Sequence, residues 1–115
     1  MESEYSVLKF FVSNTDKTGS DLLYEKIVSE AQKQGISGVT VYRGSMGYGL
    51  SSKKITNSRF WEISEKLPVV IEMTDKTDKL NEFYLSLEEK IKMTGKGCLV
   101  YTQPIDIKLH QSGKK

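Results

Sequence analysis

The sequence contains very few of the residues that build disulfides and metal sites. It has one cysteine, Cys98, and one histidine, His110, among 115 residues. An internal disulfide needs two cysteines and a multi-histidine metal site needs several imidazoles, so both are excluded. Cys98 begins an apolar run and is expected to behave as a small hydrophobe. We therefore predict neither a metal site nor a catalytic residue.

Long apolar runs and an excess of one charge are also missing. No apolar stretch approaches the ~20 residues that span a bilayer. Residues 1–4 have neither the basic start nor the apolar run of a signal peptide. Seventeen Lys and Arg against fifteen Asp and Glu give a net charge of +2, without the clustered basic excess of a general nucleic-acid binder. We therefore expect a cytoplasmic protein that does not bind nucleic acid, with a single domain over 1–115 and a flexible tail at 111–115.

The first half of the chain has a strand–helix–strand pattern. Apolar and aromatic residues partly alternate over 5–12, and 39–42 is a second β-rich run. Between these runs, apolar residues recur at helical spacing: Leu23, Ile27 and Ala31. Thr18, with Asp21 three residues later, predicts a capping box that opens this helix. Gly35 is expected to end it.

The second half repeats this order. The run 67–73 predicts a strand that Pro68 can only begin, and 75–78 supplies caps and early negative charge for a helix. That helix has an apolar stripe at helical spacing: Leu80, Phe83, Tyr84, Leu87 and Ile91. The run 98–103 predicts a fourth strand. A short extra strand is expected from the alternation of Ile105, Ile107 and Leu109.

Two consecutive β-α-β units predict an α+β fold. The expected architecture is a ferredoxin-like βαββαβ sandwich, with a four-stranded antiparallel sheet and two helices on one face. The other face of the sheet still carries apolar residues in the opposite strand phase: Tyr5, Val7, Phe11, Val70 and Tyr101. An exposed apolar face of that size usually marks a subunit contact, so we predict an oligomer.

The segment between the second and third strands breaks the periodicity. It is longer than a scaffold hairpin needs and contains Gly44, Gly47 and Gly49, which allow close approach of the backbone to an anion. Hydroxyls and cations that suit phosphate oxygens or a partner follow: Ser51, Ser52, Lys53, Lys54 and Arg59. The spacing matches neither a P-loop nor a dinucleotide fingerprint. A flexible hairpin with solvated lysines explains the composition equally well.

Three further side chains are candidates for ligand contact. Arg43 follows the second strand and could neutralise a phosphate or pair with a surface carboxylate. Tyr48, flanked by glycines, could stack on a base. Lys96 lies between Gly95 and Gly97, where a backbone nest and a cation would suit a phosphate.

Four segments in order make the chain resemble a known family. They are LYEKIV at 23–28, SGVTVYRG at 37–44, MGYG at 46–49 and LPVVIE at 67–72. Their order and spacing resemble the PII-like family called domain of unknown function 190, a branch of the PII nitrogen-regulatory superfamily. The resemblance runs from about residue 8 to residue 109. One departure is the sequence Lys54-Ile55-Thr56-Asn57, where members of this branch often carry a histidine.

The resemblance implies a signalling homotrimer whose subunit clefts bind an adenine nucleotide, AMP, ADP or ATP, as an effector with no obligatory cofactor. A T-loop at about 44–58 would contact a partner, often a membrane transporter or channel. The implied nucleotide contacts are Gly47, Tyr48 and Gly49 at the T-loop base, Thr94, Gly95, Lys96 and Gly97 in the B-loop, and Lys108 as a further cation. Arg43 and Gly44 join this set, and the partner contacts would be Ser51, Ser52, Lys53, Lys54 and Arg59.

Two other functions remain open. One is an oligomeric docking module without a ligand. The other is a small ferredoxin-like enzyme acting at the same cleft, although no paired carboxylates or poised nucleophile accompany the glycines. We therefore expect a regulator and not an enzyme.

Overall fold

The computed structural model describes residues 4–48, 56–57 and 66–113. Six of the predicted site residues lie outside the described residues: Gly49, Ser51, Ser52, Lys53, Lys54 and Arg59. Predictions about these residues therefore stay predictions.

The described chain forms a βαββαβ frame with small additions at one end. The four long strands are β1 (Tyr5–Ser13), β4 (Gly38–Arg43), β7 (Pro68–Lys76) and β8 (Leu99–Ile105). The helices are α1 (Leu23–Lys33) and α2 (Thr77–Met93). Two-residue strands form two ribbons, β2 (Lys17–Thr18) with β3 (Asp21–Leu22), and β5 (Met46–Gly47) with β6 (Thr56–Asn57).

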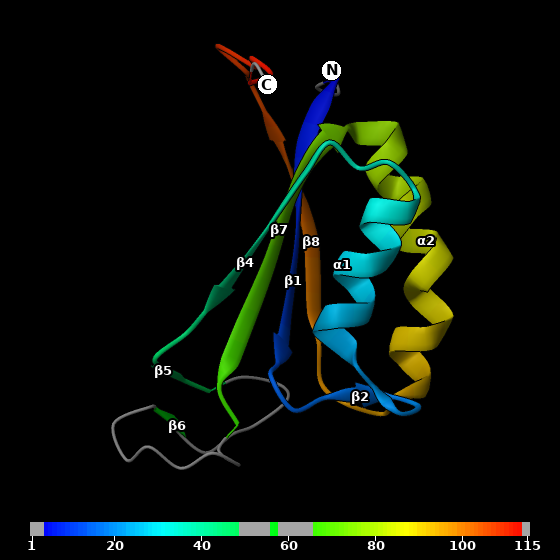
Figure 1. Cartoon of the computed structure of the whole chain (residues 1–115), viewed down its shortest axis with the longest axis vertical. Coiled ribbons are helices and arrows are strands. Elements are labelled where there is room, and N and C mark those ends of the chain that lie inside the picture. The colour runs from blue at the N-terminus through cyan, green and yellow to red at the C-terminus, as the bar shows by residue number, and fades with distance from the viewer. Residues whose placement is uncertain (1–3, 49–55, 58–65, 114–115) are drawn as a thin grey trace.

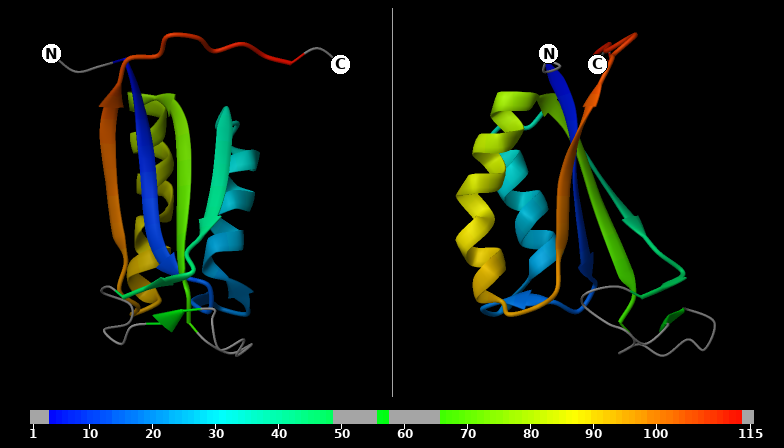
Figure 2. Two further views of the ribbon diagram at one scale, coloured as in Figure 1. Left: turned by 90° about the vertical axis from the view of Figure 1, so that its left-hand side faces the viewer. Right: turned by 180° about the vertical axis from the view of Figure 1, so that it is seen from behind.

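The long strands form one antiparallel sheet in the order β4-β7-β1-β8. Both helices pack on the same face of this sheet, and the opposite face is uncovered (Figures 1 and 2). This arrangement confirms the predicted α+β ferredoxin-like sandwich. The strand order places β4 and β8 at the two edges of the sheet.

The core lies between the sheet and the helices. Alternate residues of β1 and β7 point into it: Leu8, Phe10, Val12, Val69, Ile71 and Met73. The predicted apolar stripes of the helices face them, and Phe83 of α2 meets Phe10 edge to face with ring centroids 6.3 Å apart. Each such side chain contributes about 1.5–3 kcal/mol when fully buried. The periodicities therefore predicted the buried faces correctly.

The predicted capping box at the start of α1 is wrong. Thr18 and Asp21 pair with each other across the β2–β3 ribbon, whose turn contains Gly19 at φ +66°. The helix begins at Leu23, and its preceding residue Leu22 makes no side-chain capping bond. The backbone carbonyl of Asp16 instead accepts the Leu23 N–H at 2.8 Å. A threonine followed three residues later by an aspartate fits a tight hairpin as well as a helix start, and here strand pairing prevails.

Asp75 was predicted to cap α2, but the structure places it in β7. It is buried, and its carboxylate accepts the backbone N–H groups of Lys76 at 2.7 Å and Ser37 at 3.0 Å. Lys79 lies 3.4 Å from the same carboxylate. Burial by itself would raise the pKa of Asp75, but these hydrogen bonds and the Lys79 charge outweigh it and hold the pKa below its ordinary value. Asp75 therefore ties β7 to the connection between α1 and β4.

Replacing Asp75 with asparagine should lower the free energy of unfolding at pH 7 by about 1–3 kcal/mol, because an uncharged amide cannot accept both N–H bonds. A carboxyl whose pKa is lowered on folding stabilises the folded protein at pH values above its ordinary pKa of 3.8. This stabilisation is lost as the pH falls below that value. Urea unfolding at pH 7 and pH 3 measures the difference in free energy of unfolding between the variant and the unaltered protein. A gap of the same size at both pH values would show that the charge has no role.

The extra strand predicted after β8 does not form. Ile105 is the last residue of β8 and pairs with Tyr5, the first residue of β1. Ile107 and Leu109 follow in irregular structure, beyond the last residue of β8 that pairs with β1. In Figure 2 this tail crosses above the ends of the strands.

Candidate functional site

The glycines that begin the predicted T-loop pack against Pro68. Gly44 donates its N–H to the Pro68 carbonyl at 2.8 Å. A Cβ on Gly44 would lie 2.5 Å from Pro68 Cγ, and one on Gly47 would lie 3.3 Å from the same atom. Because Gly44 has no side chain, the backbone can pass close to the Pro68 ring where it leaves β4. The sequence suggested a ligand role for Gly44, and the structure gives it a packing role.

Arg43 turns toward α1. Its Nη2 donates to the Tyr24 hydroxyl at 2.9 Å, and its guanidinium carbon lies 5.5 Å from the centre of the Tyr24 ring. The sequence suggested a phosphate or a surface carboxylate as the partner of Arg43. The contact with Tyr24 explains the position of its guanidinium without either of them. Arg43 therefore fastens the end of β4 to the first turn of α1. The sequence did not identify Tyr24 as this partner.

Tyr48 follows the β5 strand, and its side chain is 70% exposed. No aromatic contact is recorded for it within the described part of the chain. The Tyr48 ring is therefore exposed, and its stacking on a base stays a prediction.

The predicted B-loop, 94–97, leaves the C-terminal end of α2 with Gly95 at φ +69°. Thr94 and Gly95 donate their N–H groups to the carbonyls of Ile91 and Lys92. The Lys96 N–H bonds to the Thr94 hydroxyl at 3.1 Å. Two of these N–H groups bond to α2 carbonyls and the third to the Thr94 hydroxyl, so these three N–H groups do not form the predicted backbone nest. The exposed Lys96 ammonium is the group that a phosphate would meet, at a helix end whose carbonyls favour cations.

The T-loop base and the 94–97 loop lie at the same end of the sheet but at opposite edges. Gly44 follows edge strand β4, and the 94–97 loop precedes edge strand β8 (Figure 2). Two strands separate these edges, and with a spacing of about 4.8 Å between strands the edges are roughly 14 Å apart. In the left view of Figure 2, β5 leaves the β4 edge and runs beneath the sheet toward the β8 side, so the distance between the edges does not fix how far Tyr48 lies from Lys96.

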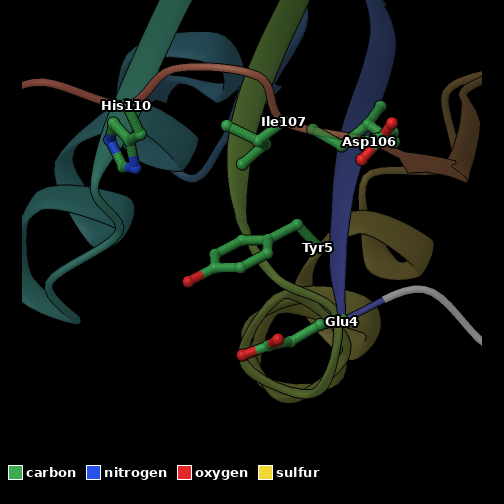
Figure 3. Close-up of a pocket in the computed structure, with 6 residues that line it drawn as sticks. Glu4, Tyr5, Asp106, Ile107 and His110 are labelled. Atoms are coloured by element: carbon green, nitrogen blue, oxygen red, sulfur yellow. The ribbon is translucent and has the colours of Figure 1, made fainter.

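Lys108 lies at the other end of the sheet, where its Nζ is 2.8 Å from the Asp106 carboxylate. A hollow of about 340 Å³ lies beside it and is lined by Glu4, Tyr5, Ile105, Asp106, Ile107 and His110 (Figure 3). Two carboxylates in this lining disfavour a phosphate. A contact between Lys108 and a nucleotide at the loop end would need a second copy of the chain.

The uncovered face of the sheet has an apolar row at the loop end. The register aligns one residue from each strand in this row: Tyr42, Val70, Phe11 and Leu99. Phe11 also stacks on Tyr101, with ring centroids 5.7 Å apart. Tyr42 is 51% exposed and Leu99 48% exposed. The next row contains the Lys9–Glu72 ion pair, with Lys9 Nζ 3.5 Å from Glu72 Oε1.

This face agrees with the sequence prediction, which placed Tyr5, Val7, Phe11, Val70 and Tyr101 on it. Tyr42 and Leu99 were not predicted to lie there. Both residues could have been predicted to lie on this face, because each belongs to the outward-facing set of alternate residues in a predicted strand.

Cys98 is half-buried beside β8. Burial and the nearby Asp16 carboxylate raise the pKa of its thiol to about 11. At neutral pH the thiol is therefore protonated and a poor nucleophile, which agrees with its assignment as a small hydrophobe. Within the described ranges, no group of three potential metal-ligating side chains occurs. No described helix has the length and apolar character that crossing a membrane requires.

Comparison with known proteins gives the family. Residues 5–107 match the DUF190 family, described as "Uncharacterized ACR". A UPF0166 protein of Methanocaldococcus jannaschii is 35% identical over 89 residues, covering 77% of this chain and 81% of the relative. A UPF0166 protein of Aquifex aeolicus is 29% identical over 84 residues, covering 73% of this chain and 79% of the relative.

Solved structures with the same fold include PII-like proteins. CPII from Thiomonas intermedia K12, a nitrogen regulatory PII-like protein bound to ADP, AMP and bicarbonate, superposes with a TM-score of 0.61 at 12% identity, over 86% of this chain and 83% of that one. A putative PII-like signalling protein from Thermus thermophilus gives a TM-score of 0.57 at 15% identity, over 90% and 89% of the two chains. The chain therefore belongs to the DUF190 family, and its fold is that of the PII-like proteins.

Proposed function

We propose that this protein is a PII-like regulator that binds an adenine nucleotide between the subunits of a homotrimer. The observation that carries the proposal is the position of the T-loop base and the 94–97 loop, at one end of the sheet but on opposite edges. If the apolar row of one copy packs against another copy, the β4 edge of one subunit can approach the β8 edge of the next. Such a cleft would combine Tyr48 from one subunit with Lys96 from its neighbour.

In this cleft the base would stack on Tyr48 and the phosphates would meet Lys96. Base stacking on an aromatic ring contributes about 1–3 kcal/mol, and a lysine provides a point charge for phosphate oxygens. Gly47, Thr94, Gly95 and Gly97 would shape the backbone around the ligand. Gly49 joins them by the family resemblance alone. The ADP and AMP bound to CPII support the choice of an adenine nucleotide.

The regulatory step would be a change in the T-loop on binding. A nucleotide can shift the loop only if it binds one loop conformation better than another. The loop would then contact a partner protein, and we propose a membrane transporter or channel through Ser51, Ser52, Lys53, Lys54 and Arg59. The alternative of an enzyme is less well supported by the described residues, because the Cys98 thiol is protonated and His110 lies at the opposite end of the sheet.

Replacing Lys96 with alanine should lower the affinity for ADP about 10- to 100-fold, which is the effect of losing a charge-assisted contact worth about 1.5–3 kcal/mol. Calorimetric titration of the two proteins measures this change. Lys92→Ala is the matched control, because Lys92 is an exposed lysine in the last turn of α2 and lies beside Glu88. Equal losses in both variants would indicate a general charge effect. An unchanged affinity in Lys96→Ala would remove Lys96 from the site.

A further inference from the structure

The uncovered face of the sheet (Figure 2) carries very little charge over three paired rows of outward-facing residues. The first is the apolar row described above. The second contains Thr40, Glu72, Lys9 and Tyr101, and the third contains Gly38, Thr74, Val7 and Gln103. Lys9 and Glu72 are the only charged residues in these rows, all of which lie within the described chain. The helix side differs, because α2 alone exposes Glu82, Glu89, Lys90 and Lys92.

Lys9 and Glu72 lie side by side at the middle of this face. They are cross-strand neighbours on the two central strands, β1 and β7, and Lys9 Nζ lies 3.5 Å from Glu72 Oε1. Their side chains are 28% and 32% exposed, so both are already partly withdrawn from water. An ammonium has three donors and a carboxylate has two acceptor oxygens. This contact therefore leaves each group able to bond a second partner of opposite charge.

Covering this pair is costly unless the covering surface brings charges of its own. A partner that packs on the neighbouring apolar row also removes Lys9 and Glu72 from water, and this loss of hydration is offset only when further hydrogen bonds satisfy the remaining donors and acceptors. A purely apolar partner offers none. A second copy of this chain offers a matching pair, because a face with one cation beside one anion is complementary to itself when Lys9 of one copy meets Glu72 of the other. The charges of this face therefore fit a second copy better than an apolar partner.

We infer that Lys9 and Glu72 select a second copy of this chain as the partner of the uncovered face, each pairing across the contact with the opposite charge of the other copy. The apolar row supplies the buried area. The charges fix which surface it meets and in which rotational setting, since like charges that meet in another setting oppose association. The inference rests on the proposed homotrimer and deepens it by naming the residues that choose the partner.

Mixing two single charge reversals tests this pairing between copies. Lys9→Glu presents two anions on the face and Glu72→Lys presents two cations, so each variant alone should associate at least about tenfold more weakly than the unaltered protein. An equimolar mixture should regain assembled mass, because the face of one variant is then complementary to the face of the other. Size-exclusion chromatography with light scattering, over a dilution series, measures the mass of each variant and of the mixture. Circular dichroism establishes that each variant is folded.

Lys26→Glu and Glu30→Lys are the matched control. This ion pair has a similar distance, 3.4 Å, and its side chains are 26% and 19% exposed, but it lies on α1 on the helix side of the sheet. Both variants and their mixture should keep the mass of the unaltered protein. If a reversal at 9 or 72 prevents folding, Lys9→Gln and Glu72→Gln each remove one charge and should show the same order of masses, alone and mixed.

Two results would overturn the selection by charge and leave the homotrimer standing. One is a pair of folded single reversals that keep the assembled mass. The other is a mixture that associates no better than its two components. A monomeric unaltered protein would overturn the homotrimer together with the pairing, so the two failures are distinguishable.

Discussion

Replacing Phe11 with aspartate is expected to convert the proposed oligomer into monomers. Phe11 lies at the centre of the apolar row, between Val70 and Leu99 in the register. Packing a second copy on this row would bury the new carboxylate, and the nearby Lys9 is already paired with Glu72, so the burial costs several kcal/mol. We expect association to weaken by about 3 kcal/mol or more, roughly 100-fold. Size-exclusion chromatography with light scattering measures the mass of each variant.

The control for this prediction is Leu85→Asp. Leu85 is also a large exposed apolar residue, 66% exposed, but it lies on α2 on the covered side of the sheet. Its variant should keep the mass of the unaltered protein. If loss of the Phe11–Tyr101 stacking harms the fold, Tyr42→Asp places a charge in the same row at a more exposed position. An assembly that survives in both Phe11→Asp and Tyr42→Asp would show that the open face is not the contact.

Replacing Gly44 with alanine should destabilise the base of the T-loop. The added Cβ would lie 2.5 Å from Pro68 Cγ and 3.3 Å from the Pro68 carbonyl oxygen, so the ring or the backbone must move. Forcing a methyl group into a packed position costs about 1–3 kcal/mol. We expect the free energy of unfolding to fall by this amount in urea titrations, with faster hydrogen exchange at the backbone amide of position 44 than in the unaltered protein.

Gly38→Ala, at the other end of β4 from Gly44, provides the comparison. A Cβ at Gly38 meets no atom within 4 Å. Its effect on the free energy of unfolding should stay within about 0.5 kcal/mol. Equal losses for the two variants would mean that the contact with Pro68 does not explain the effect at Gly44.

The secondary structure of the frame could be predicted because each element has a strong period. The strand β1 and the stripe of α2 bury one face each, and burial imposes the repeat that the sequence displays. The errors occur where a short pattern fits two structures. Thr18 and Asp21 have the spacing of a capping box but pair in a two-residue ribbon, and Asp75 has the composition of a cap but lies near the end of a strand.

The partners of the site residues could not be predicted in the same way. Arg43 bonds to Tyr24, and Gly44 packs against Pro68, which are contacts between residues far apart in the sequence. The residue types indicated a cation at Arg43 and a close approach of the backbone at Gly44. Only the folded structure shows which residue each of them contacts. Likewise, the sequence marked Lys96 as a phosphate contact, and the structure adds that its own N–H is already bonded to Thr94.

The proposed function depends above all on an adenine nucleotide binding between copies of this chain. Calorimetric titration of ADP into the unaltered protein and into the monomeric Phe11→Asp variant tests this, with circular dichroism to establish that the variant is folded. We expect saturable binding of about one ADP per chain in the assembled protein and no binding in the monomer. Binding of equal affinity in both would place the site within one chain, and no binding in the assembled protein would overturn the proposal.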